Sequence, residues 1–176
     1  AQIRFSPTGA VTLLLGTISH GQGHETVFTQ VLCDQLGIDP AKIRVVEGDT
    51  DQVTTGTGTF GSRSAALAGS AIKLAADKVI DKAKTIAAHI LEASADDIEF
   101  ADGAFRIAGT DRKTHLDNIA ALAFNADHLP LEIEPGLDET AIFNPAAPNF
   151  PNGCHVVEAE IDPDTGVTRN RYPVPG

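Results

Sequence analysis

The clearest alternation of strand and helix signals lies in residues 10–50, AVTLLLGTISHGQGHETVFTQVLCDQLGIDPAKIRVVEGDT. Residues 10–17 are apolar nearly throughout, which is typical of a strand buried on both faces. A helix is predicted near 24–37, because Glu25 favours the helix dipole at its start and Gly37 is a typical C-terminal cap. Its buried face is expected to carry Val27, Val31, Leu32 and Leu36.

The same rules extend to both sides of this stretch. QIRF and SPTG predict a strand and a turn before it, and AKIRVVEGDT predicts a strand after the helix. A long helix is expected over 65–92, because its apolar residues recur with a period near 3.6. A hairpin is expected around Asp102-Gly103, the strongest short hairpin signal, and a shorter helix near 115–124.

The last part of the chain is predicted to be less regular. Residues 125–151 are rich in Pro and Asn and are expected to cross the surface, and a second hairpin is expected over 153–174 with its turn at 163–166. The predicted fold class is α+β: a mixed β-sheet packed against two main helices, with a C-terminal β-hairpin. We expect one unit over 1–176, with a core of 1–109 and the remainder in 110–176.

The composition disfavours several kinds of partner. The formal charge of -11 disfavours a nucleic acid, because phosphate binding needs clustered Lys and Arg, and it disfavours an anionic membrane surface. No apolar run approaches the ~20 residues that span a bilayer. Cys33, in the first helix, and Cys154, in a predicted strand, are expected to be reduced and mostly buried thiols of a cytoplasmic protein. The absence of methionine suggests a piece of a longer polypeptide.

The loop SHGQGHE before the first helix has three interpretations. His20 and His24 have the spacing of two metal ligands on a helical face, but Gly21 and Gly23 between them disfavour a helix and no third ligand is near. A glycine-rich loop between a strand and a helix is also typical of an anion site, although neither the P-loop nor the dinucleotide fingerprint is matched. Taken alone, the loop is best interpreted as a helix-capping turn.

A second loop, GTGTFGSRS at 56–64, changes that balance. It again places glycines and hydroxyls before a helix, and it adds Arg63, whose side chain suits bidentate phosphate contact. Arg63 is alternatively expected to pair with Asp49 or Asp51. Two such loops in one small unit favour a ligand with two anionic points, such as a cofactor with a pyrophosphate. No catalytic residue and no metal ligand is assigned.

The two loops together carry a family resemblance. Both loops and their flanking residues resemble the molybdenum hydroxylases of the xanthine dehydrogenase and aldehyde oxidase superfamily, in particular the large subunit of bacterial aldehyde and carbon monoxide dehydrogenases. The matching stretches are GTISHGQGHETVFTQVLCDQLGI and VVEGDTDQVTTGTGTFGSRSAALAGSAI. A third stretch, FPNGCHVVEAEIDPDTG, fits the same family. The resemblance covers nearly the whole chain.

The resemblance implies a cofactor, molybdopterin cytosine dinucleotide with molybdenum. It implies that one loop lies against the pterin and its phosphate, and that the other holds the pyrophosphate and nucleotide end. Asp49 and Thr50 would shape the second loop. The implied cofactor-binding residues are His20, Gly21, Gln22, Gly23, His24 and Thr26 in the first loop, and Thr59, Phe60, Gly61, Ser62, Arg63 and Ser64 in the second.

The resemblance also implies what the chain would need around it. Its partners would be the rest of the large subunit and the FAD-binding and iron–sulfur subunits or domains. The family's general base lies nearer the C-terminus of the full subunit, so the isolated chain is expected to be inactive and to self-associate through apolar surface left uncovered. The resemblance implies a carbonyl-type substrate, and Ser19 stands where purine-oxidising relatives have a glutamate, which disfavours a purine.

Two other functions remain open. The chain could be a non-catalytic binding module for a phosphorylated ligand, since both loops suit an anion without any redox chemistry. It could also bind a metal through His20 and His24, in which case His24→Ala would remove a stoichiometric zinc ion.

Overall fold

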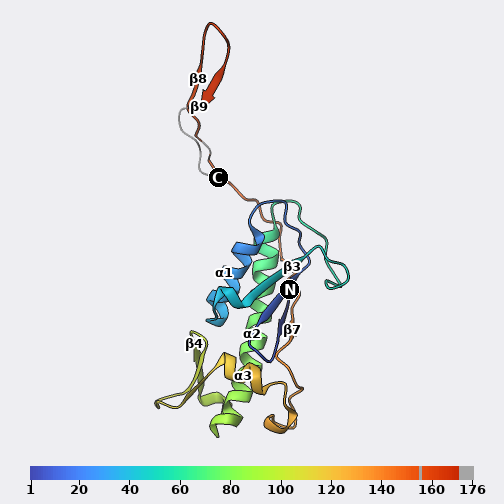
Figure 1. The fold of residues 1–176 in the computed structure, drawn as a ribbon, viewed down its shortest axis with the longest axis vertical. Coiled ribbons are helices and arrows are strands. Elements are labelled where there is room, and N and C mark those ends of the chain that lie inside the picture. The colour runs from blue at the N-terminus through green and yellow to red at the C-terminus, as the bar shows by residue number, and fades with distance from the viewer. Residues whose placement is uncertain (155, 171–176) are drawn as a thin grey trace.

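The computed structural model describes residues 1–154 and 156–170, so the end of the predicted C-terminal hairpin lies outside the described residues. The fold is α+β as predicted, with two main helices packed against a mixed sheet (Figure 1). Its three α-helices are α1 His24–Leu36, α2 Ser64–Leu91 and α3 Leu116–Leu122. Short 3-10 turns occupy Pro40–Lys42, Ala95–Asp97 and Ala126–His128.

The main sheet has the strand order β3-β2-β1-β7. β2 pairs parallel to β3 and antiparallel to β1, and β1 pairs antiparallel to β7, so the sheet is mixed. The connection from β2 to β3 runs through α1, which makes a β-α-β unit of the opening stretch. The strands are β1 Gln2–Phe5, β2 Val11–Leu15, β3 Ile43–Glu47 and β7 Glu139–Thr140.

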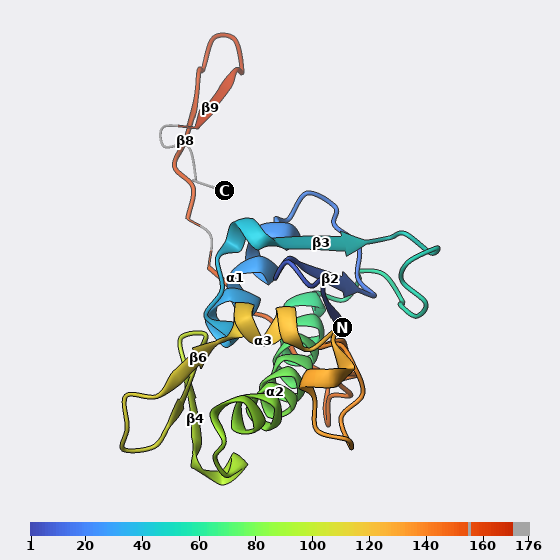
Figure 2. The ribbon, with the colours of Figure 1, turned by 60° about the horizontal axis from the view of Figure 1, so that its bottom comes forward.

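A second sheet, order β4-β5-β6, and a separate hairpin complete the described fold. In Figure 2 the second sheet lies beside the C-terminal part of α2, away from β3, and the hairpin projects from the rest of the chain. The predicted hairpins around Asp102-Gly103 and residues 163–166 are both present. The strands are β4 Ile98–Ala101, β5 Ala104–Ile107, β6 Lys113–His115, β8 Ala159–Ile161 and β9 Thr168–Asn170.

The core lies between the main sheet and the helices. Alternate residues of β1 and β2 point to the helices, and Leu14 on the opposite face of β2 is also only 3% exposed, so the predicted burial of this strand on both faces is confirmed. Each fully buried Leu, Ile or Phe contributes about 1.5–3 kcal/mol to stability. The helix α2 packs closely because its buried stripe includes the fully buried small residues Ala75, Ala76, Ala83 and Ala87.

Three expectations are corrected by the structure. The buried face of α1 carries His24, Phe28, Leu32 and Leu36, which are spaced four residues apart along the helix. Val27 was expected on this face but is 43% exposed, because it lies outside that row. Cys154 lies outside any strand and is exposed, because the segment around it does not pack on the body. The short helix begins at Leu116, later than expected, because residues 113–115 extend the second sheet.

Among the helices of the described part of the chain, none combines the length and the apolar character that a transmembrane span requires.

Candidate functional site

The two polar loops meet at one edge of the main sheet. Each follows a parallel strand, β2 or β3, and Leu15 and Glu47 at the ends of these strands are direct partners in the sheet. The first loop, 16–23, then enters α1, and the second, 48–63, enters α2. The carboxyl ends of two parallel strands therefore face the amino ends of two helices, the place where open α/β sheets bind ligands.

The two loops are joined backbone to backbone at Gly16. Its carbonyl oxygen accepts hydrogen bonds from the N–H groups of Thr57, at 3.1 Å, and Gly58, at 3.0 Å. The opposing Gly56 lies so close that a Cβ added to Gly16 would stand 2.7 Å from the Cα of Gly56. This contact requires glycine at both positions, and it holds the second loop against the end of β2.

A second joint is made by Thr59. Its hydroxyl oxygen accepts a hydrogen bond from the backbone N–H of Ile18, at 3.1 Å, and one from the hydroxyl of Ser64, at 3.0 Å. Thr59 therefore ties the first loop to the first residue of α2. Its own hydroxyl hydrogen is left to donate to a further acceptor.

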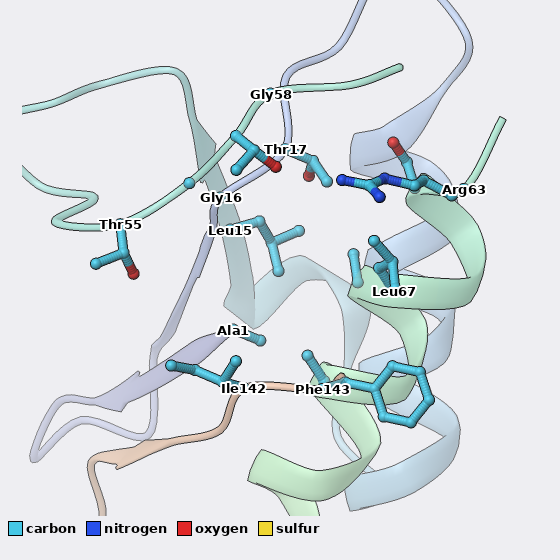
Figure 3. A pocket seen from close by; sticks show the side chains of 15 residues that line it. Ala1, Leu15, Gly16, Thr17, Thr55, Gly58, Arg63, Leu67, Ile142 and Phe143 are labelled. Atoms are coloured by element: carbon cyan, nitrogen blue, oxygen red, sulfur yellow. The ribbon is translucent and has the colours of Figure 1, made fainter. Parts of the chain in front are cut away.

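A pocket of about 280 Å³ lies between these loops and the start of α2 (Figure 3). One side of it is polar, formed by Thr17, the backbone of 55–58, Arg63 and Ser64, and the other is apolar, formed by Leu15, Leu67, Ile142 and Phe143. The first turn of α2 contains no acidic residue and its N-terminus has no side-chain cap. The dipole and the unpaired N–H groups of this 28-residue helix therefore favour an anion in the pocket.

Arg63 supplies the positive charge of this pocket. Its guanidinium lies over the ring of Phe60 at 4.1 Å from the centroid, and in Figure 3 it points from α2 toward Thr17 and Gly58. Within residues 1–154 and 156–170 no ion pair involves Arg63, so the alternative pairing with Asp49 or Asp51 is not observed. A stacked but unpaired guanidinium retains its N–H donors for a ligand.

Asp49 instead organises the start of the second loop. Its carboxylate accepts hydrogen bonds from the side-chain amide of Gln52 and from the backbone N–H of Asp51, at 3.0 Å. The hydrogen bond from Gln52 is the main reason that the pKa of Asp49 is lower than usual, with smaller contributions from the backbone N–H groups and from Arg44. Asp49 and Thr50 line a smaller pocket beside Gly58, as residues that shape this loop would.

The glycine turn of the first loop is exposed. His20, Gly21, Gln22, Gly23 and Thr26 all lie on the surface, and none of them lines the large pocket. Gly21 and Gly23 have φ of 98° and 77°, with open space where a Cβ would stand, so their requirement for glycine is conformational. His20 and His24 therefore do not share a helical face, as their intervening glycines indicated.

His24 differs from its neighbours because it is 5% exposed. Its Nδ1 lies 3.0 Å from Oε1 of Glu47, and its Nε2 lies 2.9 Å from the side-chain amide nitrogen of Gln22. Both ring nitrogens therefore have protein partners. In the part of the chain that is described, no group of three or more His, Cys, Asp or Glu side chains is arranged to hold a metal ion.

The structure thus brings some predicted site residues together and separates others. Arg63 and Ser64 line the pocket, Thr59 and Phe60 contact them, and Asn149 donates to the carbonyl of Ser62 at 3.3 Å. The sequence reasoning missed Gly16, Thr17, Gly56 and Glu47. A charged Glu47 directly after two valines at the end of a predicted strand was the available signal for the last of these.

Comparisons with known proteins show which family the chain resembles. Residues 1–172 match the family described as molybdopterin cofactor-binding domain. The chain is 40% identical over 171 residues to the carbon monoxide dehydrogenase large chain of Hydrogenophaga pseudoflava, covering 97% of this chain and 21% of that protein. It is also 40% identical to the 6-hydroxypseudooxynicotine dehydrogenase complex subunit gamma of Paenarthrobacter nicotinovorans, covering 93% and 21% respectively.

A solved structure has the same fold over nearly the whole chain. The crystal structure of a Cu,Mo-CO dehydrogenase in its carbon monoxide reduced state superposes with a TM-score of 0.85 at 39% identity, covering 97% of this chain and 21% of that one. The chain therefore spans about a fifth of the length of the relatives that it matches.

Proposed function

The chain belongs to the molybdopterin cofactor-binding domain family, and we propose that it holds the cofactor as its cytosine dinucleotide between the two loops. The observation that carries this proposal is the polar side of the large pocket, where the open N-terminus of α2 and the unpaired guanidinium of Arg63 lie together. Both features suit a doubly anionic pyrophosphate, and neither has a protein anion as partner in the described residues.

The residues present fit such a group. The backbone N–H groups of Ser64 and of the rest of the first turn of α2 would donate to one phosphate, and Arg63 would contact the pyrophosphate oxygens. Thr59, which accepts two hydrogen bonds and retains its own hydrogen, would donate a further hydrogen bond. Phe60 would keep the guanidinium in place through its ring, and Gly61 and Ser62 would shape the backbone before the helix.

The first loop would face the pterin. His20, Gly21, Gln22 and Gly23 present backbone and side-chain polar groups at the surface without a Cβ to obstruct approach at the glycines. Thr26 lies exposed in the first turn of α1. The roles of these residues toward the cofactor rest on the exposed position of the turn beside the second loop, and the buried His24 would support the turn through its contact with Gln22.

We propose further that the chain is part of a larger molybdenum-dependent oxidoreductase that oxidises a carbonyl-type substrate. In the aldehyde case the carbonyl carbon gains the oxygen of a water molecule and releases two electrons and two protons, giving a carboxylic acid. The bound cofactor would supply this two-electron chemistry. FAD-binding and iron–sulfur subunits or domains would accept the electrons, and the rest of the large subunit would supply the acid–base groups.

A cytoplasmic location is part of the same proposal. Cys33 and Cys154 are both free thiols, as expected where the redox environment is reducing. A purine is disfavoured as the substrate by Ser19, which is exposed at the front of the first loop.

The test is a direct chemical identification of the bound group. The full-length polypeptide that contains this chain would be purified, its molybdenum measured, and its cofactor released by acid hydrolysis. Cytidine monophosphate in a one-to-one ratio with the pterin is the expected product. Pterin without nucleotide would refute the dinucleotide form, and the absence of both pterin and molybdenum would leave the anion-binding module as the better interpretation of the two loops.

A further inference from the structure

A buried hydrogen-bond chain connects the end of β3 to the exposed turn of the first loop. The Glu47 side chain is 9% exposed and that of His24 is 6% exposed, yet they are 3.0 Å apart and have no other ion-pair partner in the described residues. Glu47 also accepts a hydrogen bond from the hydroxyl of Thr17, at the start of the same loop. A carboxylate this far removed from water is costly unless hydrogen bonds compensate for its lost solvation, and His24 and Thr17 supply them.

The direction of these hydrogen bonds is fixed by the last of them, between His20 and Gln22. The backbone N–H of His20 can only donate, and it donates to Oε1 of Gln22. The amide nitrogen of Gln22 must therefore be the atom that faces Nε2 of His24, and Nε2 must accept. This leaves the ring hydrogen of a neutral His24 on Nδ1, from which it donates to Glu47.

The consequence lies at the surface. Of the two hydrogens on the amide nitrogen of Gln22, one is directed at His24 and the other remains available to a ligand. If His24 carried its hydrogen on Nε2, two donors would face each other and the Gln22 amide would turn away. The orientation of the exposed Gln22 amide thus depends on which nitrogen of the buried His24 ring carries the hydrogen. Glu47 determines this position because it accepts the hydrogen bond from Nδ1.

We propose that Glu47 is a positioning residue, which acts through His24 to orient the Gln22 amide in the turn that faces the cofactor. The effect on the cofactor rests on the proposed function, whereas the hydrogen bonds between Glu47, His24 and Gln22 do not depend on it. A second contact supports a fixed ring: the imidazole of His24 lies 4.8 Å from the ring of Phe28, one helical turn further along α1.

The first measurement needs no cofactor. In the 176-residue chain, the ¹⁵N chemical shifts of the His24 ring report which nitrogen carries the hydrogen. Glu47→Leu removes both acceptor oxygens at nearly constant volume, and the hydrogen is expected to move to Nε2. Glu47→Gln retains an acceptor for Nδ1–H and is expected to preserve the wild-type pattern.

The second measurement compares cofactor occupancy in the full-length polypeptide, as molybdenum and pterin per chain. Glu47→Leu is expected to reduce the affinity for the cofactor, and with it the occupancy, by about tenfold, a loss similar to that on removing the partner that orients a ligating side chain, and Glu47→Gln is expected to retain both. Thr114→Val is the matched control, because it removes a buried hydroxyl that accepts from Asn118 at 3.0 Å on another sheet. It should lower stability without changing the His24 ring or the occupancy.

The outcomes separate the two proposals. The inference is overturned if Glu47→Leu leaves the hydrogen on Nδ1, or if the hydrogen moves and occupancy stays at the wild-type value. An equal loss of occupancy in Thr114→Val would also overturn it, since that loss would reflect stability alone. A wild-type polypeptide without cofactor would refute the proposed function, while the ring measurement would still decide whether Glu47 controls His24.

Discussion

Gly16 and Gly56 meet backbone to backbone: a Cβ on Gly56 would stand 2.5 Å from both the Cα and the carbonyl oxygen of Gly16. Neither atom belongs to a flexible side chain that can move aside. Because the carbonyl of Gly16 also accepts the two N–H groups that follow Gly56, this contact determines the distance between the two loops. The shape of the pocket therefore depends on the absence of two side chains.

The first prediction is that Gly56→Ala separates the loops. The added methyl group should push residues 55–58 away from β2, lower the free energy of unfolding by about 1–3 kcal/mol, as overpacking does, and expose the amides of Thr57 and Gly58. Hydrogen exchange at these amides and thermal denaturation measure both effects.

The control for this substitution lies in the interior of α2. Gly69→Ala places its Cβ where no atom lies within 4 Å, so it should stabilise the chain by about 0.5–1 kcal/mol. Protected Thr57 and Gly58 amides in Gly56→Ala would show that the close contact does not hold the loops together.

Periodicity was sufficient to predict much of the fold. The long helix was expected over 65–92 and spans Ser64–Leu91, because its apolar spacing is uninterrupted over seven turns and needs no tertiary information. The face of α1 was harder, because Val27 and Phe28 are adjacent apolar residues and only packing against α2 selects the second. The two-residue strand β7 has no pattern of its own and forms because the sheet edge at β1 is available.

The site was predictable only in part, for a related reason. The two loops could be predicted from their glycines, hydroxyl side chains and one arginine, because these are local features of the sequence. The joint at Gly16 and the buried pair Glu47–His24 depend on residues 23 or more positions apart in sequence, and no spacing rule connects them. Arg63 was expected from the sequence to contact an anion, which stays a prediction, and its stacking on Phe60 could be found only in the structure.

The second prediction concerns Arg63. In the full-length polypeptide, Arg63→Ala should weaken dinucleotide binding by about 1.5–3 kcal/mol, the usual contribution of a charge-assisted contact. Arg63→Lys should recover only part of this, because an ammonium retains the charge but not the fork of donors or the stacking on Phe60. Cofactor occupancy after dialysis measures both, and unchanged occupancy in Arg63→Ala would refute the assigned role.

The third prediction is a pH dependence of the second loop. The folded-state pKa of Asp49 is lowered, chiefly by the hydrogen bond from Gln52, so its contribution to loop order is present above the ordinary pKa of a carboxyl and is lost as the pH falls through the lower folded value. The backbone amide resonances of Asp51 and Gln52 should shift in that acidic range. Asp49→Asn should abolish the transition, and persistence of the transition in that variant would assign it to another group.

The fourth prediction separates the two thiols. Cys154 is exposed, whereas burial, followed by the nearby charges of Asp34 and Asp39, raises the pKa of Cys33. Because the thiolate is the reactive form, an aromatic disulfide reagent at neutral pH should modify Cys154 well before Cys33. Cys33→Ser and Cys154→Ser assign the two phases, and a fast phase retained in Cys154→Ser would contradict the described positions.

The fifth prediction is self-association of the 176-residue chain. Large apolar side chains are exposed along its C-terminal part, where Phe150 is 80%, Ile161 65% and Val167 51% exposed. An apolar surface of this kind usually marks a contact with another chain or another part of the same protein. Light scattering after size exclusion should therefore report species heavier than 18.4 kDa, in proportions that rise with concentration.

Replacing Ile161 and Val167 with Glu should shift the distribution to the monomer without lowering the thermal stability of the core, since neither residue belongs to the buried cluster. A monodisperse wild-type monomer at high concentration would show that this surface does not drive association.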